Sequence, residues 1–131
     1  MVNKVAINPT NKKENGLWSL RTDQLPLPKD FVVNERNIVY IPPGEYGGNH
    51  KHPRREAFVG VGEALYMVWQ DDQGHTHEDK MMDGEQLYVF DVESFTPHAV
   101  VNKGSGFALL VELATGPNID VEQVELLNAG E

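Results

Sequence analysis

The sequence predicts an all-β domain, built as a sandwich or barrel, and three observations support this fold class. Gly and Pro residues interrupt the chain at short intervals. The runs between them are short and rich in β-branched and aromatic residues. Gly-containing turns at 71–74 and 103–106 separate such runs and are typical of β-hairpins. With 131 residues, the chain is long enough for one domain with its own hydrophobic core.

Individual strands follow from the same pattern. The expected strands are residues 31–33, 37–41, 64–70, 75–82, 86–91 and 107–114. Residues 25–28 alternate Leu and Pro, so we expect an extended or looped segment there, because Pro donates no hydrogen bond to a ladder. The tail at 119–127 is ambiguous. Its Val and Leu residues have helical spacing, yet the alternation of Val with Glu also fits a strand.

Composition narrows the class of protein. The net charge of -9 argues against nucleic-acid and anionic-membrane surfaces, which need a basic patch. Mean hydropathy of -0.44 and the absence of a long apolar run predict a soluble protein. The N-terminus lacks the apolar region of a signal peptide, so we expect a cytoplasmic location. Because the chain has no cysteine, any metal ion must be held by nitrogen and oxygen atoms.

Four residues carry the strongest chemical signal. His50, His52 and Glu56 share one parity, so an extended strand would place them on one face. His98 follows some forty residues later. Three imidazoles and a carboxylate together suit a divalent transition metal, and ligand type alone does not choose among Zn, Mn, Fe, Ni and Co.

A second tract, His75 and His77 with Glu78 and Asp79, also contains residues that can bind metals. It follows directly after a predicted hairpin turn at the edge of a strand. We therefore interpret it as a solvated hairpin and not as a second metal site.

Two motifs in the chain resemble those of the cupin family. The first runs from Gly44 through His50, His52 and Glu56 to Gly62. The second extends from Gly84 through residues 95–98 to Asn102 and contains His98. The motifs stand in the expected order, and the resemblance covers about residues 38–114.

The resemblance implies a fold and a division of the chain. It implies a small β-barrel, the double-stranded β-helix or jelly roll, with one metal ion bound by the four residues. On this basis we expect N-terminal strands and a Pro-rich loop at 1–36, the barrel core at 37–115 and a tail at 116–131. Many single-domain cupins form homodimers by exchanging N-terminal strands, and the segment before Pro42 is long enough for this.

A weaker resemblance concerns the substrate. Residues 25–52 are similar to those of sugar-nucleotide ketoisomerases and epimerase-like cupins of polysaccharide biosynthesis. Gly47 and Pro53 stand where those proteins typically carry Arg and Lys, so a phosphate-contacting pair is missing. Arg54 or Arg55 is the predicted substitute, since Arg binds phosphate and carboxylate groups through paired hydrogen bonds.

This resemblance implies a metal-dependent isomerase or epimerase that acts on a small sugar or sugar derivative. Removal of a proton next to a carbonyl forms an enediolate, which nearby positive charge stabilises. Tyr46 and Glu45, which lie shortly before His50 in the first motif, are the predicted candidates for the catalytic base.

Three other functions stay open at this point. Three His and one Glu also suit Fe(II), as in a cupin dioxygenase. A lone cupin domain can bind a small molecule without catalysis, because fold does not determine function. Some related ketoisomerases use paired histidines for acid–base chemistry without a metal, which would give that role to His50 and His52.

Overall fold

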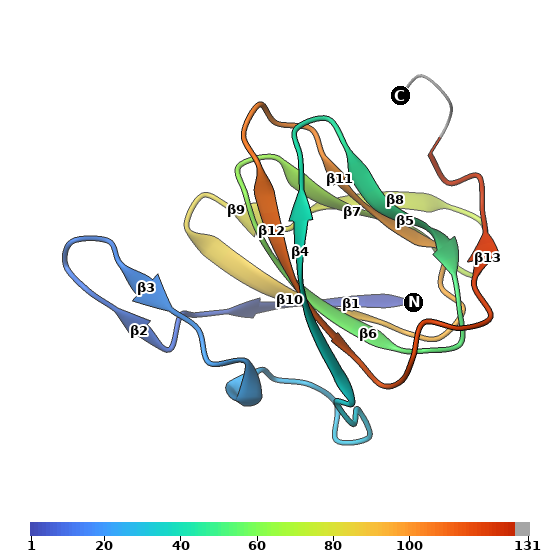
Figure 1. Ribbon diagram of the computed structural model, residues 1–131, viewed down its shortest axis with the longest axis horizontal. Helices are drawn as coiled ribbons and strands as arrows, with labels where there is room; N and C mark the ends of the chain where they lie inside the picture. The colour runs from blue at the N-terminus through green and yellow to red at the C-terminus, as the bar shows by residue number, and fades with distance from the viewer. Residues whose placement is uncertain (128–131) are drawn as a thin grey trace.

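The computed structural model describes residues 1–127, which form two large antiparallel β-sheets that pack face to face and a small two-stranded sheet (Figure 1). The larger sheet has the spatial order β1 (Val2–Ile7), β10 (Gln86–Val92), β6 (Glu56–Val61), β12 (Ala108–Ala114) and β4 (Glu35–Ile41), and β9 (Met82–Asp83) also pairs with β10. The smaller sheet has the order β13 (Glu122–Gln123), β5 (Tyr46–Lys51), β11 (His98–Asn102), β7 (Leu65–Gln70) and β8 (Thr76–Lys80). The all-β prediction is therefore confirmed.

The two sheets are not closed into a continuous hydrogen-bonded barrel. Within residues 1–127, each sheet keeps its own two edges, which are β1 and β4 in the larger sheet and β13 and β8 in the smaller one. Strands adjacent in space come from distant parts of the chain, for example β10 between β1 and β6. This arrangement brings the end of β5 and the starts of β6 and β11 to the same end of the sandwich (Figure 1).

The main core lies between the sheets. Phe58 and Phe90 come from the larger sheet and pack in one cluster with Met67 and Val100 from the smaller sheet. These side chains are 3 % exposed or less. Burial of a large apolar side chain contributes about 1.5–3 kcal/mol, so this cluster supplies much of the force that holds the sheets together.

A second apolar cluster covers the outer face of the larger sheet. The segment between β1 and β4 contains the hairpin of β2 (Asn11–Lys12) and β3 (Trp18–Ser19), the short 3-10 helix η1 (Thr22–Gln24) and the Leu-Pro run. Its apolar side chains, such as Phe31 and Leu27, pack against Val59 and Val89. Strand β6 is consequently almost entirely buried, which explains why all of its residues after Glu56 are apolar.

Most of the predicted strands are present with small changes in their bounds. Residues 64–70, 86–91 and 107–114 correspond to β7, β10 and β12. The predicted strand 75–82 is divided into β8 and β9, because β8 pairs with β7 in the smaller sheet and β9 with β10 in the larger one, and the intervening Met81 is fully buried. The ambiguous tail contains the two-residue strand β13, and residues 128–131 of the predicted tail lie outside the described residues.

The predicted strand at 31–33 is wrong. The backbone turns at this point, since the Phe31 N–H donates to the Pro28 carbonyl over 2.9 Å. Phe31 itself is buried in the outer cluster, with the Arg55 guanidinium 5.6 Å from its ring. The apolar sequence of this segment therefore reflects packing of a loop against the sheet and not pairing in a β-ladder.

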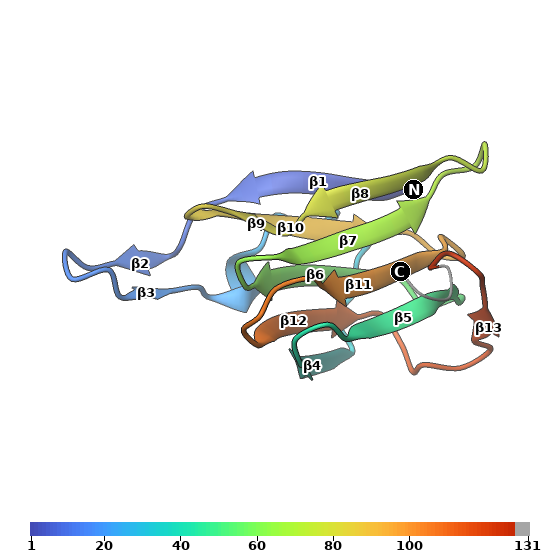
Figure 2. The same cartoon turned by 90° about the horizontal axis from the view of Figure 1, so that it is seen from above.

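The predicted domain bounds and the predicted homodimer stay predictions. In this chain, β1 pairs with its own β10 along its full length, from Val2 opposite Val92 to Ile7 opposite Leu87. The β2–β3 hairpin projects away from the sandwich (Figure 2).

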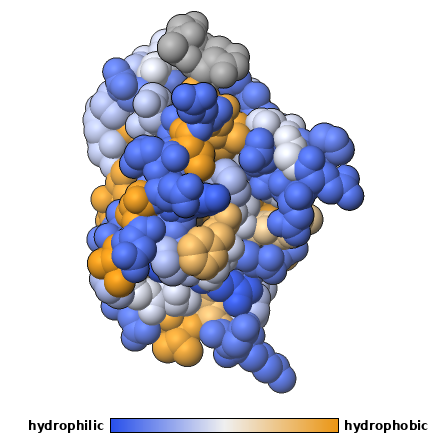
Figure 3. All heavy atoms as spheres, turned by 90° about the vertical axis from the view of Figure 1, so that its right-hand side faces the viewer, coloured by the Kyte–Doolittle hydropathy of each residue, from blue (hydrophilic) through white to orange (hydrophobic). Residues whose placement is uncertain are grey.

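Among residues 1–127, no helix has the length and apolar character that crossing a membrane would require. The end of the molecule near β13 has a mostly hydrophilic surface with scattered apolar side chains (Figure 3).

We predict that Asn102→Ala destabilises the fold by about 2–4 kcal/mol, because buried partners lose their hydrogen bonds. The Asn102 side chain is 2 % exposed and joins two loops. Its amide donates to the carbonyls of Ile41 and Gly106 over 3.0 and 2.9 Å, and its oxygen accepts from the Gly104 N–H over 3.0 Å. Urea unfolding measures the change. The exposed Asn8→Ala is the control, with an effect within about 0.5 kcal/mol, and an equally small effect of Asn102→Ala would contradict the prediction.

Candidate metal centre

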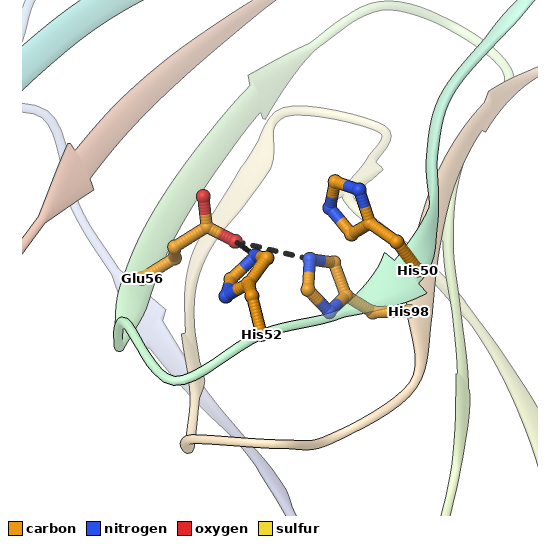
Figure 4. A group of neighbouring side chains, drawn as sticks. All are labelled: His50, His52, Glu56 and His98. Carbon is orange, nitrogen blue, oxygen red and sulfur yellow. Dashed lines mark ion pairs between the residues drawn. The ribbon is translucent and has the colours of Figure 1, made fainter. Parts of the chain in front are cut away.

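Four side chains converge at one end of the sandwich (Figure 4). His50 lies near the end of β5, Glu56 begins β6, His98 begins β11, and His52 lies in the turn between β5 and β6. One potential ligand atom from each residue lies within 4.8 Å of all the others. His52, Glu56 and His98 are each 2 % exposed, whereas His50 is half-buried. The structure thus brings together the four residues that the sequence predicted as a group.

A β-bulge in β5 positions His50 opposite His98. His50 is in register with His98, but Gly48 is in register with Ala99, so Asn49 is an extra residue in β5. Gly48 and Asn49 both have positive φ values, 87° and 67°. A Cβ atom at position 48 would lie 3.0 Å from the His98 carbonyl oxygen, which explains the need for Gly there.

The orientation of two imidazole rings is determined by backbone carbonyls. Nδ1 of His52 lies 2.9 Å from the Arg54 carbonyl oxygen, and Nδ1 of His98 lies 2.8 Å from that of Thr96. A carbonyl oxygen only accepts hydrogen bonds, so each Nδ1 must donate. In the neutral rings, the lone pair is then on Nε2, which points to the centre of the cluster.

These Nε2 atoms face the same carboxylate oxygen. Oε1 of Glu56 lies 2.8 Å from Nε2 of His52 and 3.0 Å from Nε2 of His98 (Figure 4). Both His52 Nε2 and Glu56 Oε1 are buried without a hydrogen-bond partner. Acceptor atoms held this close repel one another unless a positive charge lies between them. A metal ion bound by the cluster would supply that charge.

Electrostatics favour the ligand form of these residues. Burial and the neighbouring His98 and His52 lower the pKa of His50 to about 4, so this ring is neutral at physiological pH. Burial alone would raise the pKa of the Glu56 carboxyl, but hydrogen bonding and positive charge on the side of His52 and His98 outweigh burial and hold this pKa well below its usual range, and a bound cation would supply the same kind of stabilisation. A neutral imidazole and an ionised carboxylate are the forms that bind metals.

A cavity of about 360 Å³ adjoins the cluster, and His50, Glu56 and His98 form part of its wall. Apolar side chains from both sheets, including Ile41, Phe58, Val100 and Leu110, form another part. The remaining polar wall consists of Glu35, Asn37, Arg54, Glu112 and Asn118. The site therefore combines a potential metal centre with space for a small molecule.

Arg54 connects the polar wall to the cluster. Its Nη2 lies 2.8 Å from Oε2 of Glu56 and 2.9 Å from Oε1 of Glu112, and its Nη1 also pairs with Glu35. The Asn37 amide donates to Glu112 over 2.9 Å. Burial raises the pKa of the Glu112 carboxyl, and the negative charge of Glu56 adds to this effect. The Arg54 side chain is only 7 % exposed.

The other predicted site residues lie elsewhere. Arg55 is not part of the cavity wall, and its guanidinium binds Asp91 over 2.8 Å and Asp30 over 3.2 Å. Tyr46 and Glu45 are exposed and also lie outside the wall. The bulge at Asn49 explains why Tyr46 lies outside the wall. It reverses the side-chain alternation of β5, so that Gly47 lies on the cavity side instead of Tyr46.

The second histidine tract forms a hairpin. Asp71 accepts the backbone N–H of His75 over 2.9 Å, and its other oxygen lies 2.8 Å from Nε2 of His77. The His77 ring also stacks on Trp69 with centroids 4.2 Å apart. These contacts stabilise the turn between β7 and β8.

Sequence reasoning missed Glu35, Asn37 and Glu112. Glu112 carried the clearest signal, since it is the one charged residue in the otherwise apolar segment 107–114. A charged side chain inside such a strand is expensive to bury unless it has a partner. Its partner, Arg54, lies 58 residues away in sequence, so this pairing has no local signature.

Comparisons with known proteins agree with this architecture. No protein-family model matches the sequence, and no curated protein matches it significantly. Solved structures do match. A dTDP sugar isomerase from Desulfovibrio desulfuricans G20 is 10% identical over 94% of this chain and 83% of its own, with a TM-score of 0.74. QdtA, a sugar 3,4-ketoisomerase from Thermoanaerobacterium thermosaccharolyticum, is 14% identical over 88% and 81%, with a TM-score of 0.61.

The capsular polysaccharide assembling protein CapF from Staphylococcus aureus also matches, with 22% identity, a TM-score of 0.61 and coverage of 70% of this chain. This chain spans only 28% of CapF. At these identities the likeness concerns the fold, and it agrees with the two motifs and with the sheet order. The chain has the jelly-roll fold of the cupins.

Proposed function

We propose that the cluster of His50, His52, Glu56 and His98 binds one divalent transition-metal ion, and that the adjoining cavity hosts isomerisation or epimerisation of a sugar or sugar derivative. One observation carries the proposal. Three imidazoles and one carboxylate converge at the end of a cavity, and two of their buried atoms, His52 Nε2 and Glu56 Oε1, lack hydrogen-bond partners. A site built only for stability would pair these atoms with donors inside the protein.

The donor set supports a metal site that stays open on one side. Nitrogen and carboxylate ligands suit Zn, Mn, Fe, Ni or Co, and four such ligands leave positions free on a six-coordinate ion. His50, Glu56 and His98 lie at the cavity, and His50 is half-buried, whereas the buried His52 lies outside the cavity wall. When bound, the ion would supply positive charge beside the oxygen atoms of a substrate as negative charge develops on them.

The protein's own residues would orient the substrate and limit its contact with water. Ile41, Phe58 and Leu110 form an apolar wall, on which the C–H face of a sugar ring can pack. The polar wall lies next to this surface in the same cavity. Two proteins with similar folds, the dTDP sugar isomerase and the sugar 3,4-ketoisomerase QdtA, act on sugars by name, which supports a sugar as the substrate class.

One prediction from the proposed function concerns metal content. Protein purified without a tag and measured by mass spectrometry should contain about one divalent metal ion per chain. His50→Ala and His98→Ala should each weaken binding by at least about 100-fold, since each removes a direct ligand and loss of an outer-shell partner already costs about 10–100-fold.

His75→Ala is the matched control for metal content, because this His is exposed and lies outside the cluster. It should bind metal like the native chain. A native chain that stays metal-free after supplementation with Zn, Mn, Fe, Ni and Co would contradict the proposal and favour metal-free acid–base chemistry by His50 and His52. Iron with oxygen-dependent turnover would support a dioxygenase instead.

Another prediction from the proposed function concerns the catalytic base. Tyr46→Phe and Glu45→Gln should keep the metal and change sugar turnover by less than about twofold, because neither side chain belongs to the cavity wall. Loss of a general base typically costs about 10²–10⁴-fold. Turnover is measured by following exchange of solvent deuterium into the sugar. A loss of about 100-fold in either variant would instead support the assignment that the sequence suggested.

A further inference from the structure

We infer that the cavity takes an uncharged, hydroxyl-rich ligand, and that Glu35, Asn37 and Glu112 bind its hydroxyl groups while excluding phosphate and carboxylate groups from this wall. The inference rests on the proposed function for the metal centre, and it names the chemical class of the substrate. Its basis is the hydrogen-bonding capacity of the polar wall.

Arg54 is the one Lys or Arg residue among the described residues of the cavity wall, and its donors are already used. An arginine has five N–H groups. Nε donates to Glu56, and Nη2 donates to Glu56 and Glu112. Nη1 donates to Glu35 and, over 3.3 Å, to the Gly116 carbonyl oxygen. A phosphate group could bind this guanidinium only by displacing a carboxylate of the protein.

The atoms that the wall does offer are acceptors. Oε2 of Glu35 and Oε1 of Glu112 receive hydrogen bonds from Arg54 and Asn37. Among the hydrogen bonds of residues 1–127, the second carboxylate oxygen of each Glu and the side-chain oxygen of Asn37 have no donor. Hydroxyl groups can donate to these three oxygens, whereas an ionised phosphate or carboxylate cannot.

The charges of the wall lead to the same preference. Glu35, Glu56 and Glu112 carry negative charge against the single guanidinium of Arg54, which leaves two net negative charges beside the cavity. A bound divalent ion would neutralise this total, but it would lie at the cluster end. An anionic group at the polar wall would still be close to Glu35 and Glu112, and repulsion at such distances costs about tenfold or more in affinity.

A separate observation distinguishes this site from an acidic patch on the surface. Glu56 is 2 % exposed, and its unpartnered Oε1 is part of the cluster that adjoins the same cavity. The polar wall, the unpartnered carboxylate and the apolar wall therefore enclose one space. A sugar has matching parts, since its hydroxyls can meet acceptors while its C–H groups meet Ile41 and Leu110.

Calorimetry on the metal-loaded protein tests the inference. The probes are a panel of unmodified pentoses and hexoses, the monophosphate of each, glucosamine as an ammonium-bearing sugar, and dTDP. We expect at least one unmodified sugar to bind more tightly than its monophosphate. Glu112→Gln should weaken binding of that sugar by at least about tenfold, because an amide is a weaker acceptor for hydroxyl groups than a carboxylate.

The double variant Glu35→Gln with Glu112→Gln provides a gain that damage to the fold would not produce. It should bind the sugar monophosphate at least about tenfold more tightly than the native protein, since two negative charges are removed from the wall. Glu14→Gln is the matched control, because Glu14 is exposed in the β2–β3 hairpin, and it should change neither affinity.

Three outcomes would overturn the inference. They are tighter binding of a monophosphate or dTDP than of every unmodified sugar, tighter binding of glucosamine than of its neutral counterpart, and an unchanged monophosphate affinity in the double variant. Failure of the proposed function is separable. Unmodified sugars that bind without being isomerised would leave the inference intact, whereas isomerisation restricted to phosphorylated sugars would refute the inference alone.

Discussion

The buried carboxylate of Glu56 is the charge on which the site depends. An ionised group at 2 % exposure is costly unless opposite charges and hydrogen bonds compensate for the lost water. Each of its oxygens meets a different part of the protein, with Oε1 facing His52 and His98 and Oε2 bound by Arg54. The compensation then extends outward, because Arg54 also binds Glu35 and Glu112, and Asn37 joins those two carboxylates. The metal centre and the polar wall are thus one electrostatic unit.

Apolar packing on both faces of the larger sheet allows this unit to be buried. Strand β6 begins with Glu56 and continues with residues that pack inward against Phe90 or outward against Phe31. The N-terminal segment with its Leu-Pro run therefore contributes to the site without touching it. A packed core transmits strain and limits relaxation, so the positions of Glu56 and Glu112 are determined by contacts well beyond the cavity.

The fold class and the four members of the cluster could be predicted from the sequence. The expected placement of three of them on one strand was only partly right. Shared parity was expected to align His50, His52 and Glu56 on one strand. Instead β5 ends at Lys51, His52 lies in the turn, and Glu56 starts the next strand. The grouping held because ligand chemistry and motif order do not depend on the local backbone. The bulge at Asn49 and the pairing of Arg54 with Glu112 could not be predicted, because both depend on register between distant strands.

The saturated guanidinium of Arg54 also bears on how selective the cavity can be. Ion pairs already hold Glu35, Glu112 and Arg54 in place, so binding of a ligand would cost little side-chain conformational entropy. A small number of contacts can therefore give useful affinity. The same rigidity removes the freedom to adapt to another shape. A wall organised in this way favours a narrow set of hydroxyl stereochemistries. Two sugars that differ in configuration at one carbon would then be distinguished, because the acceptor atoms keep fixed positions.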